Sequence, residues 1–327
     1  MKHTLYLECA SGISGDMTVA ALLDLGADEQ YLRGRLDSLN LDGYALEIHE
    51  VKKNGIRAKK FDVILERDEK VPWPHDHGHA HQHPHQDGHG HVHAHQNDHG
   101  HSHEHSHEHE DGHEHGHEHS HEHEDGHEDG HEHGHEHGHE HGHDHEHGHT
   151  HSHADDHRNL AAVTEVLRSG SLTTEEVDLA LRIFTIIAEA ESHAHQLPID
   201  QVHFHEVGAV DSIVDIAAAA ICLTDLGIKD VVVTALNEGT GFVRCHHGQL
   251  PVPAPAVLYI CEKHGIPLRV VSEVEGEMIT PTGAAIVAAI RTADALPSPM
   301  TVIKSGSGAG TKDLPITNIL RAMLIDG

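Results

Sequence analysis

A histidine-rich tract from His75 to His157 divides this sequence and limits how the chain can fold. The tract holds 36 of the 45 histidines and 21 of the 54 acidic residues, and it contains no Lys or Arg. It alternates His with Gly, Glu, Asp and Ser, so it offers almost no apolar surface to bury in a core. We therefore expect a disordered insertion at 73–157, with an N-terminal α/β lobe at 1–72 before it and a second α/β lobe at 158–327 after it.

The segments on either side of the tract carry regular hydrophobic patterns. Apolar residues at three- and four-residue spacing predict helices over 17–26, 159–170, 174–195, 209–226, 253–264 and 280–291. Short apolar or alternating runs predict strands over 5–9, on both sides of Asn54-Gly55 within 44–66, and over 229–236, 267–272 and two segments of 301–325. Asn54-Gly55 is a strong hairpin signal between two of these strands. The mixture predicts an α+β (mixed α/β) fold with two folded lobes.

Charge and cysteine usage restrict the class of protein. Outside the tract, 33 acidic residues face 21 basic ones, which argues against a nucleic-acid-binding domain and fits a cationic partner such as a metal. The four cysteines form no C-x-x-C pair, and the N-terminus has no signal-peptide pattern. The longest apolar run, 209–228, contains Asp211, Asp215 and Asp225, so it predicts a buried helix and not a membrane span. We expect a cytoplasmic protein.

The tract itself has the composition of a metal buffer. Imidazole suits nickel, zinc, copper and cobalt, and repeated H-x-H offers many ligand pairs without one fixed geometry. We expect reversible binding of several ions, weakening as the pH falls through the histidine pKa of about 6.5. The alternatives are a repeat that merely solvates the chain and an expression tag. An internal, long and irregular tract is not typical of a tag.

A second histidine motif, HFHEVGAVDSIVDI at 203–216, has a different character. An extended HFH segment places His203 and His205 on one face, and Glu206 follows. Asp211 and Asp215 are spaced i, i+4, so they share one face of an apolar helix, where carboxylates need a cation or several donors. The spacing fits a metal or substrate site, and it equally fits a helix entrance capped by satisfied polar groups.

Four glycine- or cysteine-containing motifs have two interpretations each. SGISGD at 11–16 lies between a strand and a helix, which suits a phosphate, or a tight turn with Ser14 as the N-cap. TPTG gives Thr280 as an N-cap before a proline, which is also the pattern of any well-capped helix. The triplet at 245–247, Cys-His-His, suggests soft-metal ligation but is short. GSGAGTKD at 306–313 fits a phosphate-cradling loop or a hairpin.

Taken in order, five motifs resemble a known family. They are SGISGDM (11–17), HFHEVGAVDSIVDI (203–216), HGQLPVPAPA (247–256), GEMITPTGAA (276–285) and SGAGTKDLP (within 305–315). Together they are similar to the LarC family of nickel insertion proteins, and the resemblance covers nearly the whole chain outside the tract.

The resemblance implies a specific activity. The family inserts Ni(II) into pyridinium-3,5-bisthiocarboxylic acid mononucleotide, which becomes the nickel-pincer cofactor of lactate racemase-type enzymes. The reaction is a CTP-dependent cyclometallation that needs Mn²⁺ or Mg²⁺, so the implied enzyme is a nickel chelatase of the lyase class. Family members continue into a CTP-associated C-terminal domain beyond the point where this chain ends, at Gly327. We therefore expect this chain to be an N-terminal part that needs a C-terminal domain or a separate C-terminal polypeptide.

The implied chemistry needs nickel ligands, a phosphate site and a base. The predicted nickel ligands are His203, His205, Glu206, Asp211, Asp215, His246 and His247. The predicted phosphate-binding residues are Ser11, Gly12, Ser14, Gly15, Asp16, Thr280 and Thr282. The base accepts the proton lost from the pyridinium carbon as the nickel–carbon bond forms, and the catalytic candidates are Glu206, His205 and Asp211.

Other partners and rival functions complete the prediction. An apo-racemase is an expected recipient of the cofactor, a homo-oligomer is expected, and neither nucleic acid nor a membrane is. The main alternative is a non-catalytic nickel store or chaperone, supported by the tract. A further alternative, a metal-dependent hydrolase built on the H-x-H cluster, needs additional ligands that the sequence does not place.

Overall fold

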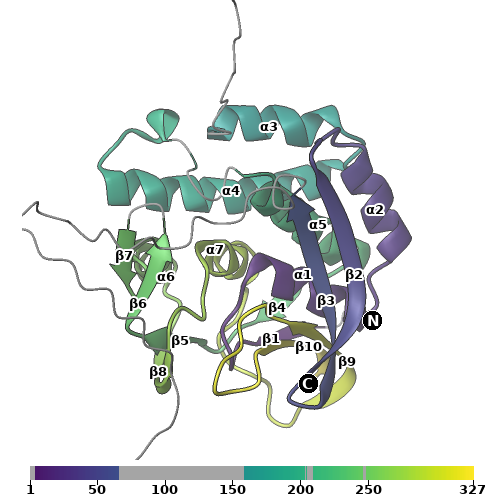
Figure 1. Cartoon of the computed structure of the whole chain (residues 1–327). Helices are drawn as coiled ribbons and strands as arrows, with labels where there is room; N and C mark the ends of the chain where they lie inside the picture. Colours follow the sequence, from purple (N-terminus) through teal and green to yellow (C-terminus); the bar gives the residue numbers. More distant parts are fainter. Residues whose placement is uncertain (1–3, 66–157, 203, 205–208, 246–247) are drawn as a thin grey trace, which may run out of the picture. The chain divides into compact units, whose positions relative to one another are not determined.

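The computed structural model describes residues 4–65, 158–202, 204, 209–245 and 248–327 (Figure 1). The histidine tract predicted at 73–157 lies outside these residues. The described residues before and after the tract belong to one compact unit. Helices are present together with both parallel and antiparallel strand pairs, so the predicted α+β class is confirmed.

The main sheet has six strands in the order β2-β3-β9-β10-β1-β4. Its strands are β1 (Thr4–Glu8), β2 (Tyr44–Lys53), β3 (Ile56–Leu65), β4 (Asp230–Val232), β9 (Thr301–Ala309) and β10 (Ile319–Asp326). β1 pairs antiparallel with β10 and parallel with β4. The sequence predicted a lobe on each side of the tract; in the structure, this one sheet contains three strands from before the tract and three from after it.

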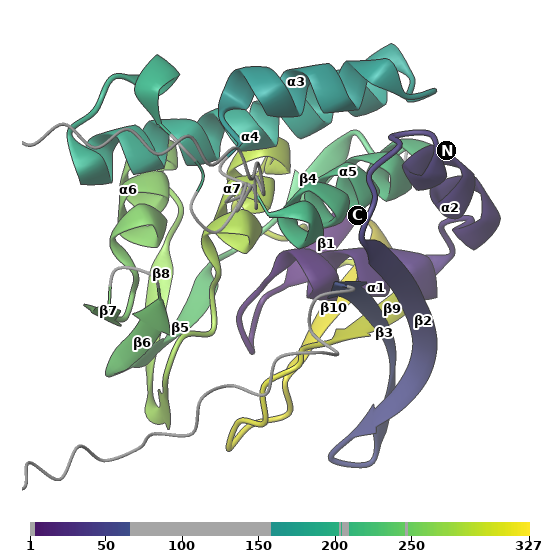
Figure 2. The same cartoon turned by 45° about the horizontal axis from the view of Figure 1, so that its top comes forward.

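Helices are layered on the sheet. α1 (Gly15–Leu25) packs against β3, β9 and β10, α5 (Val210–Asp225) packs on α1, and α4 (Thr174–His195) packs on α5. Figures 1 and 2 show α3 (Leu160–Ser169) running beside α4 on the side away from the sheet. The four alanines 217–220 of α5 are fully buried between these layers, as expected for a helix that is apolar nearly all round.

The remaining helices pack on α4 and α5: α2 (Glu29–Asp37) contacts α5, whereas α6 (Pro255–His264) and α7 (Pro281–Ile290) contact α4 and each other. The 3-10 turn Ile199–Gln201 also contacts α4. Two small sheets complete the described fold, β5 (Leu236–Thr240) with β8 (Leu268–Glu275) and β6 (Phe242–Cys245) with β7 (Gly248–Pro251). None of the described helices is both long enough and apolar enough to cross a membrane.

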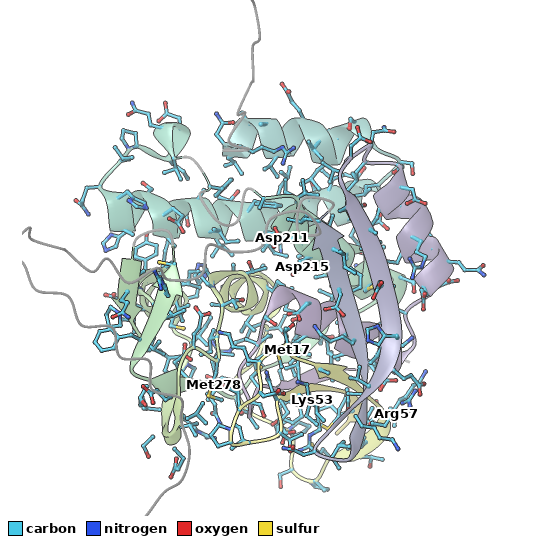
Figure 3. All side chains as sticks on the ribbon, viewed as in Figure 1. Met17, Lys53, Arg57, Asp211, Asp215 and Met278 are labelled. Carbon is cyan, nitrogen blue, oxygen red and sulfur yellow. The ribbon has the colours of Figure 1, made fainter. Side chains whose placement is uncertain are left out.

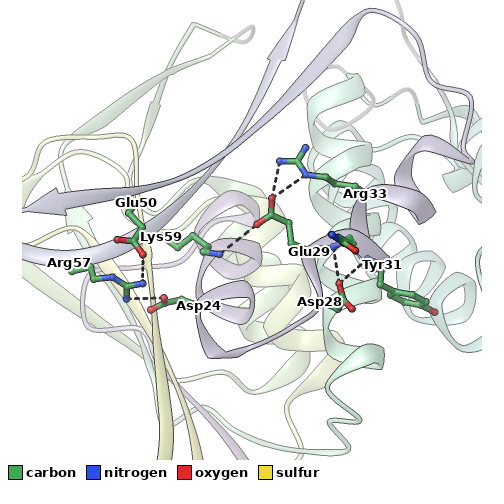
Figure 4. Close-up of polar contacts among 9 residues, drawn as sticks. Asp24, Asp28, Glu29, Tyr31, Arg33, Glu50, Arg57 and Lys59 are labelled. Atoms are coloured by element: carbon green, nitrogen blue, oxygen red, sulfur yellow. Dashed lines mark hydrogen bonds and ion pairs between the residues drawn. The ribbon is translucent and has the colours of Figure 1, made fainter.

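The predicted hairpin at Asn54-Gly55 is confirmed. Both residues have positive φ, 48° and 80°, which matches the two central positions of a type I′ turn. The flanking strands β2 and β3 pair in continuous register from Lys53 and Ile56 onward. A side chain of β3 also contacts a helix: Lys59 Nζ lies 3.7 Å from Oε2 of Glu29 in α2 (Figure 4).

The GSGAGTKD motif is a strand and its following loop. A Cβ at Gly308 would lie 2.0 Å from the Met17 carbonyl oxygen, so the absence of a side chain lets β9 approach the backbone of α1. Beyond the strand, Lys312 donates to Glu277 and Asp313 pairs with Lys53 at 2.8 Å. These contacts support the structural interpretation of this motif and leave its glycines inside the fold.

Two predicted elements differ from the structure. The strand predicted over 229–236 is divided between β4 and β5, which belong to different sheets, because Val233 leaves the main sheet and donates its N–H to Ala293. The helix predicted from residue 253 starts at Pro255, since Ala254 has an extended backbone and proline suits the first helical position.

Candidate functional site

A pocket of about 560 Å³ lies where four helices begin. Its walls include Ser14–Asp16 of α1, Asp211 and Ser212 of α5, 254–256 of α6 and 280–282 of α7. The end of α4 and strand β6 complete it. Because a helix N-terminus carries partial positive charge and free N–H groups, four of them around one cavity favour an anionic ligand.

The same pocket is rich in carboxylates. Five acidic side chains line it: Asp16, Glu191, Asp211, Asp215 and Glu277. Among the described lining residues, Arg244 is the single Lys or Arg. Such a surplus of negative charge attracts a cation, so the cavity combines anion-binding backbone with cation-binding side chains.

Asp215 is the carboxylate most affected by its surroundings. Burial raises its pKa well above the usual value, and the nearby charges of Asp16 and Asp211 raise it further. The ammonium group of Lys60 and the backbone N–H of Asp16 act in the opposite direction. A Cβ at Gly15 would lie 2.5 Å from Asp215 Oδ2, so a glycine is needed here for α1 and α5 to meet. Asp211 and Asp215 lie between α4 and α1 (Figure 3).

Asp16 belongs to a partly buried charge network. Its Oδ1 accepts a hydrogen bond from the Ser14 hydroxyl, and its Oδ2 lies 3.0 Å from Lys60 Nζ. Lys60 is only 7% exposed and also contacts Asp62 at 2.9 Å and the Thr311 hydroxyl at 2.9 Å. Sequence reasoning missed Lys60, although strand alternation places it on the same face as the buried Ala58.

The two predicted phosphate motifs are brought together, but not every residue faces the pocket. Ser14, Gly15, Asp16, Thr280 and Thr282 line it. Thr280 is an N-cap, as its hydroxyl accepts from the Gly283 N–H at 3.1 Å, whereas the Ser14 hydroxyl is not used for capping.

Ser11 and Gly12 make structural contacts away from this wall. The Ser11 hydroxyl donates to the Thr317 carbonyl oxygen at 2.7 Å, and Gly12, with a φ of 84°, donates its N–H to Cys9. Neither residue lines the pocket, and a role for them in binding stays a prediction.

Five predicted nickel ligands, His203, His205, Glu206, His246 and His247, lie outside the described residues. Their described neighbours are informative. Phe204 is 1% exposed and packs on Phe184 with ring centroids 5.8 Å apart, and Cys245 lines the pocket. Within the described part of the chain, no three His, Cys, Asp or Glu side chains are grouped closely enough to hold a metal ion.

The end of α4 adds two titratable lining residues that the motifs did not include. His195 Nε2 lies 3.3 Å from Glu191 Oε2, and both side chains line the pocket. The i, i+4 spacing of Glu191 and His195 at the end of a long helix was the available signal. Arg244 was likewise missed, since it is an isolated charged residue in its segment, and Glu277 lies within the GEMITPTGAA motif without having been assigned a role.

The cavity thus joins carboxylates, which suit a cation, to helix N-termini, which suit an anion. The family profile described as "Nickel insertion protein" matches residues 5–327, and the chain belongs to this family.

Three relatives show how far the similarity extends. Proteins named pyridinium-3,5-bisthiocarboxylic acid mononucleotide nickel insertion protein are 42% identical over 326 residues in Alkaliphilus metalliredigens and 35% over 322 in Geobacillus kaustophilus. A protein of the same name in Akkermansia muciniphila is 33% identical over 328 residues. The alignments cover 100%, 98% and 99% of this chain but 61%, 59% and 60% of the relatives, so the chain spans about three fifths of their length. No solved structure matches the chain.

Proposed function

We propose that this chain carries the nickel-handling part of a protein that inserts Ni²⁺ into pyridinium-3,5-bisthiocarboxylic acid mononucleotide. The observation that carries the proposal is the convergence of four separate motif segments on one pocket of about 560 Å³. That volume is in the range of sites for small-molecule ligands. The family and the names of the relatives support the same activity.

The phosphate of the mononucleotide is assigned to the helix starts of α1 and α7. Ser14, Gly15 and Asp16 begin one helix, and Thr280 and Thr282 begin the other. Backbone N–H groups at helix starts suit phosphate oxygens. Arg244 of β6 also lines the pocket. Its positive charge offsets the repulsion between the phosphate and the carboxylates.

Nickel is the second substrate and needs donors of moderate strength. Asp211 and Asp215 provide oxygen donors from one face of α5, and His203, His205 and Glu206 precede that helix in the sequence. His246 and His247 follow Cys245, which lines the pocket. A few N/O ligands leave coordination positions that the two thiocarboxylate sulfurs can occupy.

The insertion also requires a proton acceptor. The pyridinium C–H bond breaks as the nickel–carbon bond forms, and the proton passes to a base in the pocket. Glu206, His205 and Asp211 are the candidates. Asp211 is the candidate that the structure describes, and it faces the cavity at the first turn of α5.

CTP with Mn²⁺ or Mg²⁺ does not fit the described pocket. Arg244 is the one Lys or Arg that lines it among the described residues, so a triphosphate, more negative than the single phosphate assigned above, would have one cationic side chain to offset it. We therefore assign CTP to the predicted C-terminal part. A C-terminal domain or polypeptide that binds CTP, an apo-racemase recipient, a homo-oligomeric state and a cytoplasmic location stay predictions.

The test compares two aspartates on one helix. Nickel insertion is measured with the full chain, a C-terminal polypeptide from a relative, CTP and Mn²⁺. Asp211→Asn should lower the insertion rate by about 100-fold if Asp211 is the base. Asp225→Asn is the matched control, because Asp225 lies at the far end of α5 and accepts a hydrogen bond from the Asp28 N–H. Equal rates for the two variants would remove Asp211 from the reaction.

A nickel store is the second candidate function, and the histidine tract favours it. A store needs no pocket, so substitutions at the pocket would leave its nickel content and delivery unchanged. The double variant His203→Ala with His205→Ala separates the two functions. An unchanged insertion rate would contradict the site assignment, whereas loss of insertion with retained nickel content supports the insertion function.

A further inference from the structure

Glu238 of β5 is a carboxylate in the interior of the protein, outside the pocket. Its residue exposure is 0%, and its Oε1 accepts hydrogen bonds from three backbone N–H groups. The donors are Gly239 at 2.9 Å, Met278 at 2.6 Å and Ile279 at 3.2 Å. Its Oε2 has no hydrogen-bond partner among the described residues. Two of these donors, Met278 and Ile279, are consecutive, so the carboxylate holds their backbone segment in place.

The backbone segment that Glu238 holds, 277–280, lies at the wall of the pocket. Glu277 and Thr280 line the cavity, and Thr280 caps the start of α7. Met278 and Ile279 lie between these two lining residues, and Met278 is labelled in Figure 3. Holding the two middle amides therefore fixes the positions of the lining residues on either side.

The segment is also joined to the turn that starts α1. Ile13 donates its N–H to the Met278 carbonyl oxygen at 3.0 Å, and Thr280 donates its N–H to the Ile13 carbonyl oxygen at 3.1 Å. Ile13 precedes Ser14, the first pocket residue of α1. A continuous chain of contacts thus runs from Glu238 through 278–280 to the start of α1.

We propose that Glu238 is a positioning residue that fixes the spacing between the N-termini of α1 and α7, and thereby orients the anionic group of the mononucleotide. This inference rests on the proposed function, because it assigns the phosphate to those two helix starts. Glu238 itself touches neither substrate. Burial raises the pKa of its carboxyl group, while the three backbone N–H groups act to lower it.

The test is steady-state nickel insertion by the full chain with its C-terminal polypeptide, CTP and Mn²⁺, at varied mononucleotide concentration. Glu238→Ala should raise the KM for the mononucleotide about tenfold or more with a smaller change in kcat, because small misplacements of binding groups are costly. Glu238→Gln keeps an oxygen for the three amides and should restore a KM within about twofold of the parent. Glu275→Ala, an exposed carboxylate at the end of β8, is the matched control and should change nothing.

Several results would overturn the proposal. They are an unchanged KM in Glu238→Ala, a fall in kcat alone, or a glutamine variant that behaves like the alanine variant. If Glu238→Ala does not fold, Glu238→Asp replaces it, since its carboxylate is withdrawn by one methylene and the same rise in KM is expected.

Amide hydrogen exchange of 277–280 is measured on the same proteins without substrate. Faster exchange in Glu238→Ala or Glu238→Asp than in Glu238→Gln is expected. Equal exchange would show that Glu238 does not hold the backbone of 277–280 in place. This measurement does not depend on insertion activity. A parent protein without insertion activity would therefore count against the proposed function alone, while the exchange result still decides the role of Glu238.

Discussion

Replacing Lys60 by methionine tests whether the charge network beside the pocket stabilises the fold. Lys60 Nζ lies 3.0 Å from Asp16 Oδ2 and 2.9 Å from Asp62 Oδ1, and the side chain is 9% exposed. Methionine has nearly the same length and fills the same space without a charge or a hydrogen-bond donor. Lys60→Met therefore leaves two carboxylates facing each other without their shared cation.

The expected loss follows from the burial of the partners. Removing one member of a buried ion pair costs about 3–5 kcal/mol, because the remaining charge is left uncompensated. The Asp16 and Asp62 side chains are 24% and 32% exposed, so water can take over part of the solvation of each carboxylate. We therefore expect the lower end of the range, a loss of about 3 kcal/mol in the free energy of unfolding.

Urea unfolding at pH 7 measures the loss, and the neighbouring lysine provides the control. Lys59 lies 3.7 Å from Glu29, with side chains 21% and 38% exposed, so Lys59→Met should cost less than about 1 kcal/mol (Figure 4). Combining Lys60→Met with Asp16→Asn should cost less than the sum of the two single changes. Equal losses at positions 59 and 60 would refute the assignment of a stabilising network to Lys60.

Three further predictions concern single residues. Because the raised pKa of Asp215 makes the folded state bind a proton more tightly than the unfolded state, its carboxyl group should lower stability by up to about 1.4 kcal/mol per pH unit as the pH rises above about 4. Asp215→Asn should remove that loss, so the free energy of unfolding of the variant, relative to that of the parent, should be higher at pH 7 than at pH 4 in urea unfolding. A difference between variant and parent that does not change with pH would contradict this. Gly308→Ala should cost about 1–3 kcal/mol in thermal unfolding, because its Cβ would lie 2.0 Å from the Met17 carbonyl oxygen. Gly34→Ala in α2 meets no atom within 4 Å and should instead stabilise by about 0.5–1 kcal/mol. Thr280→Ala should cost about 1 kcal/mol of stability through loss of the N-cap bond to Gly283, measured by the same thermal unfolding.

Local signals predicted local structure well. The Asn54-Gly55 turn requires two positive φ values, and the sequence supplies residues that adopt them. Helix α4 begins with a capping box in which Thr173 and Glu176 satisfy each other's backbone, so its start can be read from four neighbouring residues. These features depend on contacts between residues close in sequence.

The order of the strands could not be read in the same way. β1 lies between β10 and β4, whose residues are more than 200 positions away in sequence, and alternation says nothing about which strands pair. Glu238 was missed for a related reason. A glutamate in a short strand resembles an exposed edge residue, and two of its three backbone partners, Met278 and Ile279, come from another part of the chain.

The candidate site was predictable in part. The motifs at the starts of α1, α5 and α7 do meet at one cavity, but the sequence did not separate residues that face it from residues that hold it in place. Ser11 and Gly12 belong to the same motif as Ser14, yet they contact backbone elsewhere. A phosphate-binding loop and a tightly packed turn both require small residues, so residue type alone does not distinguish a binding role from a structural one.

The tract and the pocket should respond differently to nickel supply. Repeated imidazole pairs offer many weak sites, whereas the pocket carboxylates are held by α1 and α5 in one arrangement. Replacing 75–157 by a Gly/Ser segment of equal length should therefore leave insertion unchanged at high nickel and reduce it at low nickel. The reduction should be smaller at pH 6 than at pH 7.5, because protonated imidazole does not bind metal and the parent tract then stores less. Insertion that disappears at every nickel concentration, in a chain whose unfolding transition is unchanged, would instead make the tract part of the delivery step itself.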